Sequence, residues 1–275
     1  MRRVGTLLSY LCISALAALW LFPVLLVLMN ACKTLQDYSR GNIWKWPQEF
    51  VLFQNIRDAW VLGGLGKGFV NSIGYGVIGA VCSILLASLA AYALTFLRIK
   101  GAFYWFLLIY SGTIFPFQMY LIPLYFAYQK TGLFNTFGGM ALFYVAICIP
   151  FCVFLLRNYM KTLPVEVVEA ARIEGCSNFK VYWNIVMPMC LSPAYVLFIF
   201  QFTWVWNDLI FGLTLTQTPE IRPIMAGLSS MQGVFFRTGV TTLMAGVLIT
   251  SIPTILVFLA LQRSFIRGLQ LTIKG

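Results

Sequence analysis

The chain has 275 residues, of which 60% are hydrophobic and only 10% are charged. Soluble globular proteins carry about 25% charged residues, so this composition excludes an ordinary water-soluble domain and indicates a membrane protein. The net charge of +11 is spread between apolar runs and forms no dense basic patch. This distribution argues against nucleic-acid binding and leaves the basic residues as signals of membrane topology.

Six stretches free of charged residues follow one another along the chain, and each predicts a transmembrane helix. Each stretch exceeds the ~20 residues that a helix needs to cross ~30 Å of hydrocarbon, and lipid forces the backbone to satisfy its own hydrogen bonds. The first run is longer than the apolar core of a signal peptide, so we expect it to stay as a helix. We expect a single transmembrane domain over residues 1–275, with spans at residues 5–32, 69–97, 102–127, 138–156, 189–216 and 239–262.

The placement of Lys and Arg in the loops predicts the orientation of these spans. With the N-terminus inside, the inner loops hold more basic residues over a shorter length than the outer loops do, as the positive-inside rule requires. Both termini, and the loop between the fourth and fifth spans, are then cytoplasmic. Prolines such as Pro116, Pro150 and Pro253 lie inside the spans and predict kinked helices.

The cytoplasmic loop at residues 161–188 is the most informative polar segment of the chain. Pro164 suits the first turn of a helix, because its missing N–H needs no partner there. Gly175 suits the end of that helix, and a second short helix is expected over residues 178–184. Such an amphipathic hairpin either places its apolar face in the groove of a partner protein or only stiffens the loop.

The spacing of residues in this loop resembles a known motif. Glu169-Ala170-Ala171 is followed after three residues by Gly175 and, nine residues later, by residues 185–188 (IVMP). This pattern resembles the EAA motif, EAA-x3-G-x9-I-x-L-P, of permease subunits of binding-protein-dependent ATP-binding-cassette importers. The only departure is Met187, where the family pattern has leucine. By this resemblance, the residues that couple the permease to its ATPase are Glu169, Ala170, Ala171, Gly175, Ile185 and Pro188.

The resemblance implies a fold and a set of partners. The fold is all-α, that of a MetI-like type I importer permease, with six transmembrane helices and a cytoplasmic coupling-helix loop. The partners are a homologous second permease subunit, two ATPase subunits that bind ATP and Mg, and an extracellular solute-binding protein. The chain itself would be a multi-pass protein of the cell (inner) membrane, would need no cofactor or metal, and would not be an enzyme.

Other short matches resemble the carbohydrate-importer branch of this family, the maltose-permease-like proteins. This narrower resemblance implies that the chain forms part of a translocation pathway for a sugar, an oligosaccharide or a polyol-like solute. The matching positions are Asn71-Ser72, Ala90-Ala91-Tyr92-Ala93 and Trp206-Asn207-Asp208.

Asp208 is the one ionisable residue deep in a predicted span. A charge at the bilayer centre costs at least ~2.5–3.5 kcal/mol, so Asp208 either lines the substrate route or holds its helix against a neighbour. Trp206, together with Trp204, could stack on sugar faces or could belong to an interfacial aromatic belt. Asn207 and Gln118 complete the candidates for the pathway.

The absence of certain motifs limits the alternatives. The glycine-rich segment Gly63–Gly68 lacks the spacing of a phosphate-binding loop, so the energy must come from another chain. A secondary, ion-coupled transporter would need coupling-ion ligands, and a membrane-embedded enzyme would need a nucleophile or a metal set, yet the sequence contains no histidine. Arg172 and Glu174 either form ion pairs with the ATPase or are solvated.

Overall fold

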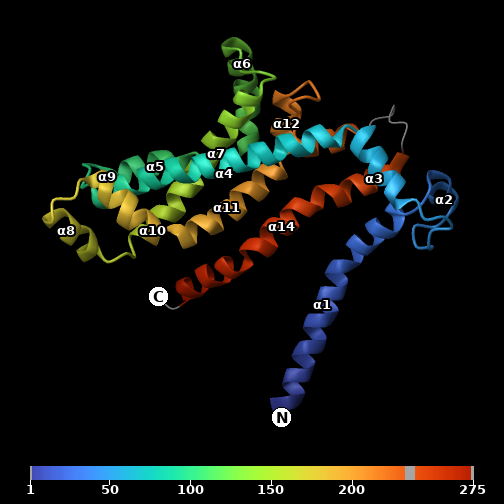
Figure 1. The fold of residues 1–275 in the computed structure, drawn as a ribbon, viewed down its shortest axis with the longest axis horizontal. Helices are drawn as coiled ribbons and strands as arrows, with labels where there is room; N and C mark the ends of the chain where they lie inside the picture. The colour runs from blue at the N-terminus through green and yellow to red at the C-terminus, as the bar shows by residue number, and fades with distance from the viewer. Residues whose placement is uncertain (1, 233–238, 274–275) are drawn as a thin grey trace. The chain divides into compact units, whose positions relative to one another are not determined.

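The computed structural model describes residues 2–232 and 239–273, and within these residues it contains helices and no strand (Figure 1). The chain divides into two compact units. The first consists of Met1–Gly66 and Gly227–Ile252, and the second of Lys67–Ala226 and Pro253–Gly275. The predicted site residues all belong to the second unit.

The first unit is organised around the end of a long apolar helix. The amide of Asn55 donates to the carbonyls of Ala31 (2.8 Å) and Lys33 (2.9 Å), which supplies hydrogen bonds where carbonyls at a helix end would otherwise lack a partner. The buried Lys33 ammonium donates to Asn30 Oδ1 at 2.9 Å and to the Asn42 carbonyl at 3.2 Å. The helices are α1 (Arg2–Ala31), α2 (Leu35–Arg40), α3 (Leu52–Val61) and the start of α14 (Gly239–Ile273).

The second unit packs its helices around α4, in two apolar clusters. Glycines on α4 permit close approach, because a Cβ at Gly76 would lie 2.7 Å from the Phe202 ring and one at Gly79 would lie 3.3 Å from Val205. The helices outside residues 161–188 are α4 (Leu65–Phe96), α5 (Ala102–Ser111), η1 (Phe117–Tyr120), α6 (Leu121–Thr131), α7 (Phe137–Met160), α11 (Leu191–Trp206), α12 (Ile210–Leu215), the start of α13 (Ile224–Ser230) and the end of α14. The first residues of α4 and the remainder of α13 belong to the first unit.

Four helices in the described part of the chain are long and apolar enough to cross a membrane, and they coincide with the first, second, fourth and sixth predicted spans. A fifth candidate arises where Asn178–Met189 and Leu191–Trp206 are joined with a bend of 72°. The four unbroken candidates are Leu8–Ala31, Leu65–Phe96, Phe137–Met160 and Gly239–Ala260.

The third predicted span, residues 102–127, is interrupted rather than continuous. Helix α5 ends before Gly112, and η1 begins only after Pro116, whose ψ of 123° is not helical. Proline has no N–H to donate, so a regular helix cannot pass through this point undisturbed. The count of six membrane crossings therefore stays a prediction.

Candidate functional site

The segment of residues 161–188, here called the EAA segment, begins with the expected helix. Helix α8 (Val165–Ile173) starts directly after Pro164. Just beyond its end, Gly175 has a φ of +83°, in the left-handed region that glycine adopts without strain. The N–H of Cys176 donates to the Ala171 carbonyl at 3.0 Å, which closes the end of the helix.

The second half of the EAA segment differs from the expected helix over residues 178–184. Helix α9 (Asn178–Val181) is one turn long and passes into a π-helix, η2 (Tyr182–Val186), before α10 (Met187–Met189). The Met187 N–H donates to the carbonyl of Tyr182, five residues back. Because Pro188 follows and has no N–H, the regular α-helical hydrogen-bond pattern is interrupted here.

The motif residues of the EAA segment divide into a buried and an exposed group. Ala171 is buried and packs, with Val168, in the cluster that contains the end of α4. Glu169 and Ala170 are exposed. Pro188 is also exposed, whereas Ile185 is partly buried. Helix α8 therefore packs one face on its own chain and leaves the start of the motif on the surface.

A hollow of about 540 Å³ lies between the end of α4 and the EAA segment. At this hollow, Arg98 Nη2 lies 3.8 Å from Glu169 Oε1, and both side chains are largely exposed. Exposed pairs of this kind contribute about 0–1 kcal/mol, so the pair with Arg98 would give way to a stronger partner for Glu169. The lining residues are Phe96, Leu97, Arg98, Glu169, Arg172, Ile173 and Asn178.

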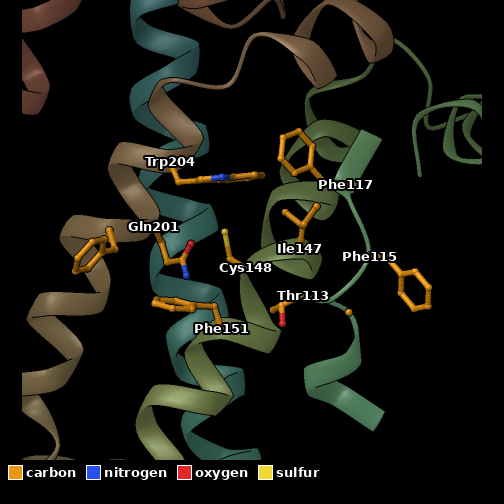
Figure 2. Close-up of a pocket in the computed structure, with 10 residues that line it drawn as sticks. Thr113, Phe115, Phe117, Ile147, Cys148, Phe151, Gln201 and Trp204 are labelled. Atoms are coloured by element: carbon orange, nitrogen blue, oxygen red, sulfur yellow. The ribbon is translucent and has the colours of Figure 1, made fainter. Parts of the chain in front are cut away.

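A second cavity, of about 320 Å³, is lined by the link between α5 and η1 and by α7 and α11 (Figure 2). Figure 2 shows the rings of Trp204 and Phe151 on either side of the Gln201 and Cys148 side chains. Phe117 meets the Trp204 ring edge to face, with centroids 6.4 Å apart. The remaining lining residues are Gly112, Thr113, Phe115, Ile147 and Phe200.

Gln201 is a buried polar side chain in the lining of this cavity, with 6% of its surface exposed. Its Nε2 donates to Cys152 Sγ at 3.4 Å, which orients the amide. Gln201 was not among the residues predicted from the sequence, because it matches none of the family motifs and carries no charge. An uncharged polar residue within the apolar helix α11 was the signal that could have identified it.

Three of the predicted pathway residues lie outside the cavity lining. Trp206 is fully buried and packs against Phe69 and Phe202, with ring centroids 5.4 Å and 5.9 Å away. The amide of Asn207 donates to the carbonyl of Thr203, four residues back, at 2.8 Å. Gln118 is exposed, and although it follows Phe117 in sequence it does not line the cavity.

Asp208, the fourth predicted residue, also lies outside the cavity lining and connects α7 to α12. Tyr144 Oη on α7 donates to Asp208 Oδ2 at 2.9 Å. The N–H groups of Phe211 and Gly212 donate to the same carboxylate at 3.3 Å and 3.0 Å, so Asp208 satisfies free donors at the start of α12. This geometry favours the structural alternative for Asp208 over a role in lining the substrate route.

Comparison with known proteins gives matches over nearly the whole chain. The family model described as "Binding-protein-dependent transport system inner membrane component" matches residues 2–270. The osmoprotective compounds uptake permease protein of Synechocystis sp. is 32% identical, over 94% of this chain and 89% of that protein. The diacetylchitobiose uptake system permease protein of Streptomyces coelicolor is 30% identical, over 90% of this chain and 83% of its own length.

A solved structure matches the fold. It is the crystal structure of a bacterial ABC transporter involved in the import of the acidic polysaccharide alginate, and the match has a TM-score of 0.80 with 20% sequence identity. The match covers 95% of this chain and 96% of the other. At this level of identity the likeness concerns the arrangement of the helices.

Proposed function

We propose a sugar-import role for this chain, which belongs to the family of binding-protein-dependent transport system inner membrane components and is therefore a permease subunit of an importer. The solute would be a neutral sugar, an oligosaccharide or a polyol. The main structural support for this proposal is the aromatic cavity lined in part by α7 and α11 (Figure 2). Relatives named for the uptake of diacetylchitobiose, a disaccharide, and of osmoprotective compounds support it.

The chemistry of the cavity suits a neutral polyhydroxylated solute. A sugar ring has an apolar face of C–H groups that can stack on aromatic rings, and Trp204 and Phe151 present such rings here. Its hydroxyl groups need hydrogen-bond partners, which the Gln201 amide and the Thr113 hydroxyl can supply. A few polar groups in an apolar wall are typical of sites that fix the orientation of a small ligand.

The lining also argues against a charged solute. None of its residues, which run from Gly112 to Trp204, is acidic or basic. An ion that entered such a cavity would lose its hydration without gaining a partner of opposite charge. The same argument disfavours the alternative of an ion-coupled secondary transporter with its ion site here.

The proposed importer needs further chains around this one. The exposed Glu169 and Ala170 would contact one of two ATPase subunits, which bind ATP and Mg, while this chain would catalyse no reaction and hold no cofactor. A homologous second permease would complete the pathway, and a solute-binding protein would deliver the sugar from outside. Both termini and the EAA segment would be cytoplasmic, and the interrupted third span would complete six crossings. Movement of the ATPases would then switch the pathway between two states.

A matched pair of substitutions tests the proposal. Gln201→Leu is tested in vesicles that contain the assembled transporter, and it should lower the rate of sugar transport about 2- to 12-fold. This range corresponds to the loss of one hydrogen bond to the sugar, which contributes about 0.5–1.5 kcal/mol. Asn207→Leu is the control, because the Asn207 amide bonds to a carbonyl at the end of its own helix, and it should transport normally. A Gln201→Leu variant that transports every sugar of a neutral panel at the normal rate would remove the cavity from the proposed pathway.

A further inference from the structure

Arg172 belongs to the EAA segment but does not point its guanidinium at a carboxylate. Its Nη2 donates to the carbonyl of Phe96, the last residue of α4, at 2.9 Å. Within the described residues Arg172 forms no ion pair, and its buried Nε has no hydrogen-bond partner. The structure therefore uses this cation to bind the end of a different helix, 76 residues earlier in the chain.

The end of α4 is a suitable place for such a bond. The last four carbonyls of a helix lack partners within it, and the aligned peptide dipoles give this end a partial negative charge that favours a cation. After Phe96 the chain leaves the helix, and Arg98 takes a left-handed conformation with φ 51°. Arg172 thus satisfies a carbonyl that the helix itself cannot satisfy.

Other contacts join the same part of α4 to the EAA segment. Tyr182 Oη and Ser88 Oγ lie 2.7 Å apart in a buried hydrogen bond, and the rings of Tyr182 and Tyr92 have centroids 5.4 Å apart. Val168 of α8 packs in the same cluster as Tyr92. Both halves of the EAA segment therefore pack against the last turns of α4.

We infer that Arg172 is a positioning residue for energy coupling, which joins the EAA segment to the C-terminal end of α4 so that a displacement of α8 moves α4 directly. This inference rests on the proposed docking of an ATPase on the EAA segment. The alternative route runs only along the chain, from α8 into its neighbours α7 and α11. On that route Arg172 would be dispensable for coupling.

Helix α4 is placed to carry the displacement toward the cavity. From Phe96 to Gly76 it extends about 30 Å, at ~1.5 Å per residue. Around Gly76 and Gly79 it packs closely on Phe202 and Val205 of α11, the helix that contributes Gln201 and Trp204 to the cavity. A shift of a packed, rigid helix is a physical means of coupling two distant sites.

The test compares variants in the complete transporter, reconstituted in vesicles with its ATPase and binding protein. Arg172→Met removes the donor but keeps an apolar stem, and Arg172→Ala is a second loss variant in case the first fails to insert. Each should retain the ATPase and hydrolyse ATP, while the solute transported per ATP falls about 5-fold or more, the size of a typical coupling effect. Arg172→Lys should recover part of this ratio, because it restores a cationic donor at the helix end.

The control is Lys100→Ala, which removes an exposed cation close to the end of α4 but outside the EAA segment, and it should leave the ratio unchanged. Loss variants that transport the normal amount of solute per ATP would overturn the inference while leaving the proposed function intact. An equal fall in Arg172→Met and Lys100→Ala would also overturn it, because the effect would then follow from charge alone. Failure of the unmodified chain to bind any ATPase would instead overturn the proposed function itself.

Discussion

The EAA segment and the aromatic cavity differ in how far apart in the sequence their residues lie. The motif of the EAA segment occupies residues 169–188, and its hairpin forms largely from neighbours in sequence. The cavity is lined by residues between Gly112 and Trp204 that come from the segment between α5 and α6, from α7 and from α11, and only the packing of the second unit brings these three parts together. A local pattern can therefore be recognised from sequence, whereas a surface assembled by packing has to be seen in the structure.

The largest expected effect concerns the exposed part of the EAA segment. Glu169→Lys should abolish solute uptake while the protein still inserts in the membrane, because it reverses a charge at the proposed ATPase contact and disturbs little of the packing beneath α8. Glu166→Lys is the control, since Glu166 is also exposed on α8 but lies outside the motif. Uptake and membrane content are measured on the same cells. Normal uptake by Glu169→Lys, or equal loss in both variants, would count against the coupling assignment.

The next largest effect distinguishes the roles of Trp204 and Trp206, which both lie on α11. Trp206→Ala should reduce the amount of folded protein, because removal of a buried aromatic side chain costs about 3–5 kcal/mol. Trp204→Ala should leave the protein folded and reduce sugar transport, because its ring lines the cavity. Thermal unfolding in detergent and transport in vesicles give the two readings. If Trp204→Ala lost only stability and Trp206→Ala lost only transport, the division of roles would be reversed.

The sequence could predict the long apolar helices but not the packing that gives Trp204 and Trp206 different roles. Hydropathy located α1, α4, α7 and α14, because lipid imposes a length and an apolar composition on each helix. The sequence could not show that the ring of Trp206 packs against Phe69, since the two residues meet only in the fold. For the same reason the sequence did not distinguish Trp206 from Trp204 as the residue whose ring could stack on a sugar, and Gln201 was not predicted.

Asp208 gives a smaller effect that distinguishes a structural residue from a pathway residue. Asp208→Asn should lower the free energy of unfolding by about 1–3 kcal/mol, because hydrogen bonds from Tyr144, Phe211 and Gly212 lose a charged acceptor. The dependence of transport on sugar concentration should stay the same in the protein that remains folded. Tyr144→Phe should act in the same direction, and the double variant should be less destabilised than the sum of the two. Additive losses, or a changed affinity for sugar, would contradict this role.

The smallest effect is expected at an exposed ion pair. Lys67 Nζ and Glu220 Oε1 lie 3.0 Å apart, and the hydrogen bond from Lys67 holds the pKa of Glu220 below its usual value. A lowered folded-state pKa gives a contribution to stability that is present above the unfolded-state pKa and is lost as the pH falls through the folded-state value. Glu220→Gln should therefore lower the unfolding temperature slightly at neutral pH and leave it unchanged in acid. A loss of equal size at both pH values would show that the ion pair is not its cause.

Cys148 offers the most direct test of the claim that the aromatic cavity receives the transported sugar, because it is a thiol in the cavity lining (Figure 2). In a functional variant that keeps Cys148 as its only cysteine, the rate of modification by a small thiol reagent is measured in the assembled transporter, with and without a transported sugar. We expect the transported sugar to slow the modification of Cys148, and a sugar that is not transported to have no effect on its rate. Modification at the same rate with and without a transported sugar would show that the sugar does not enter the cavity.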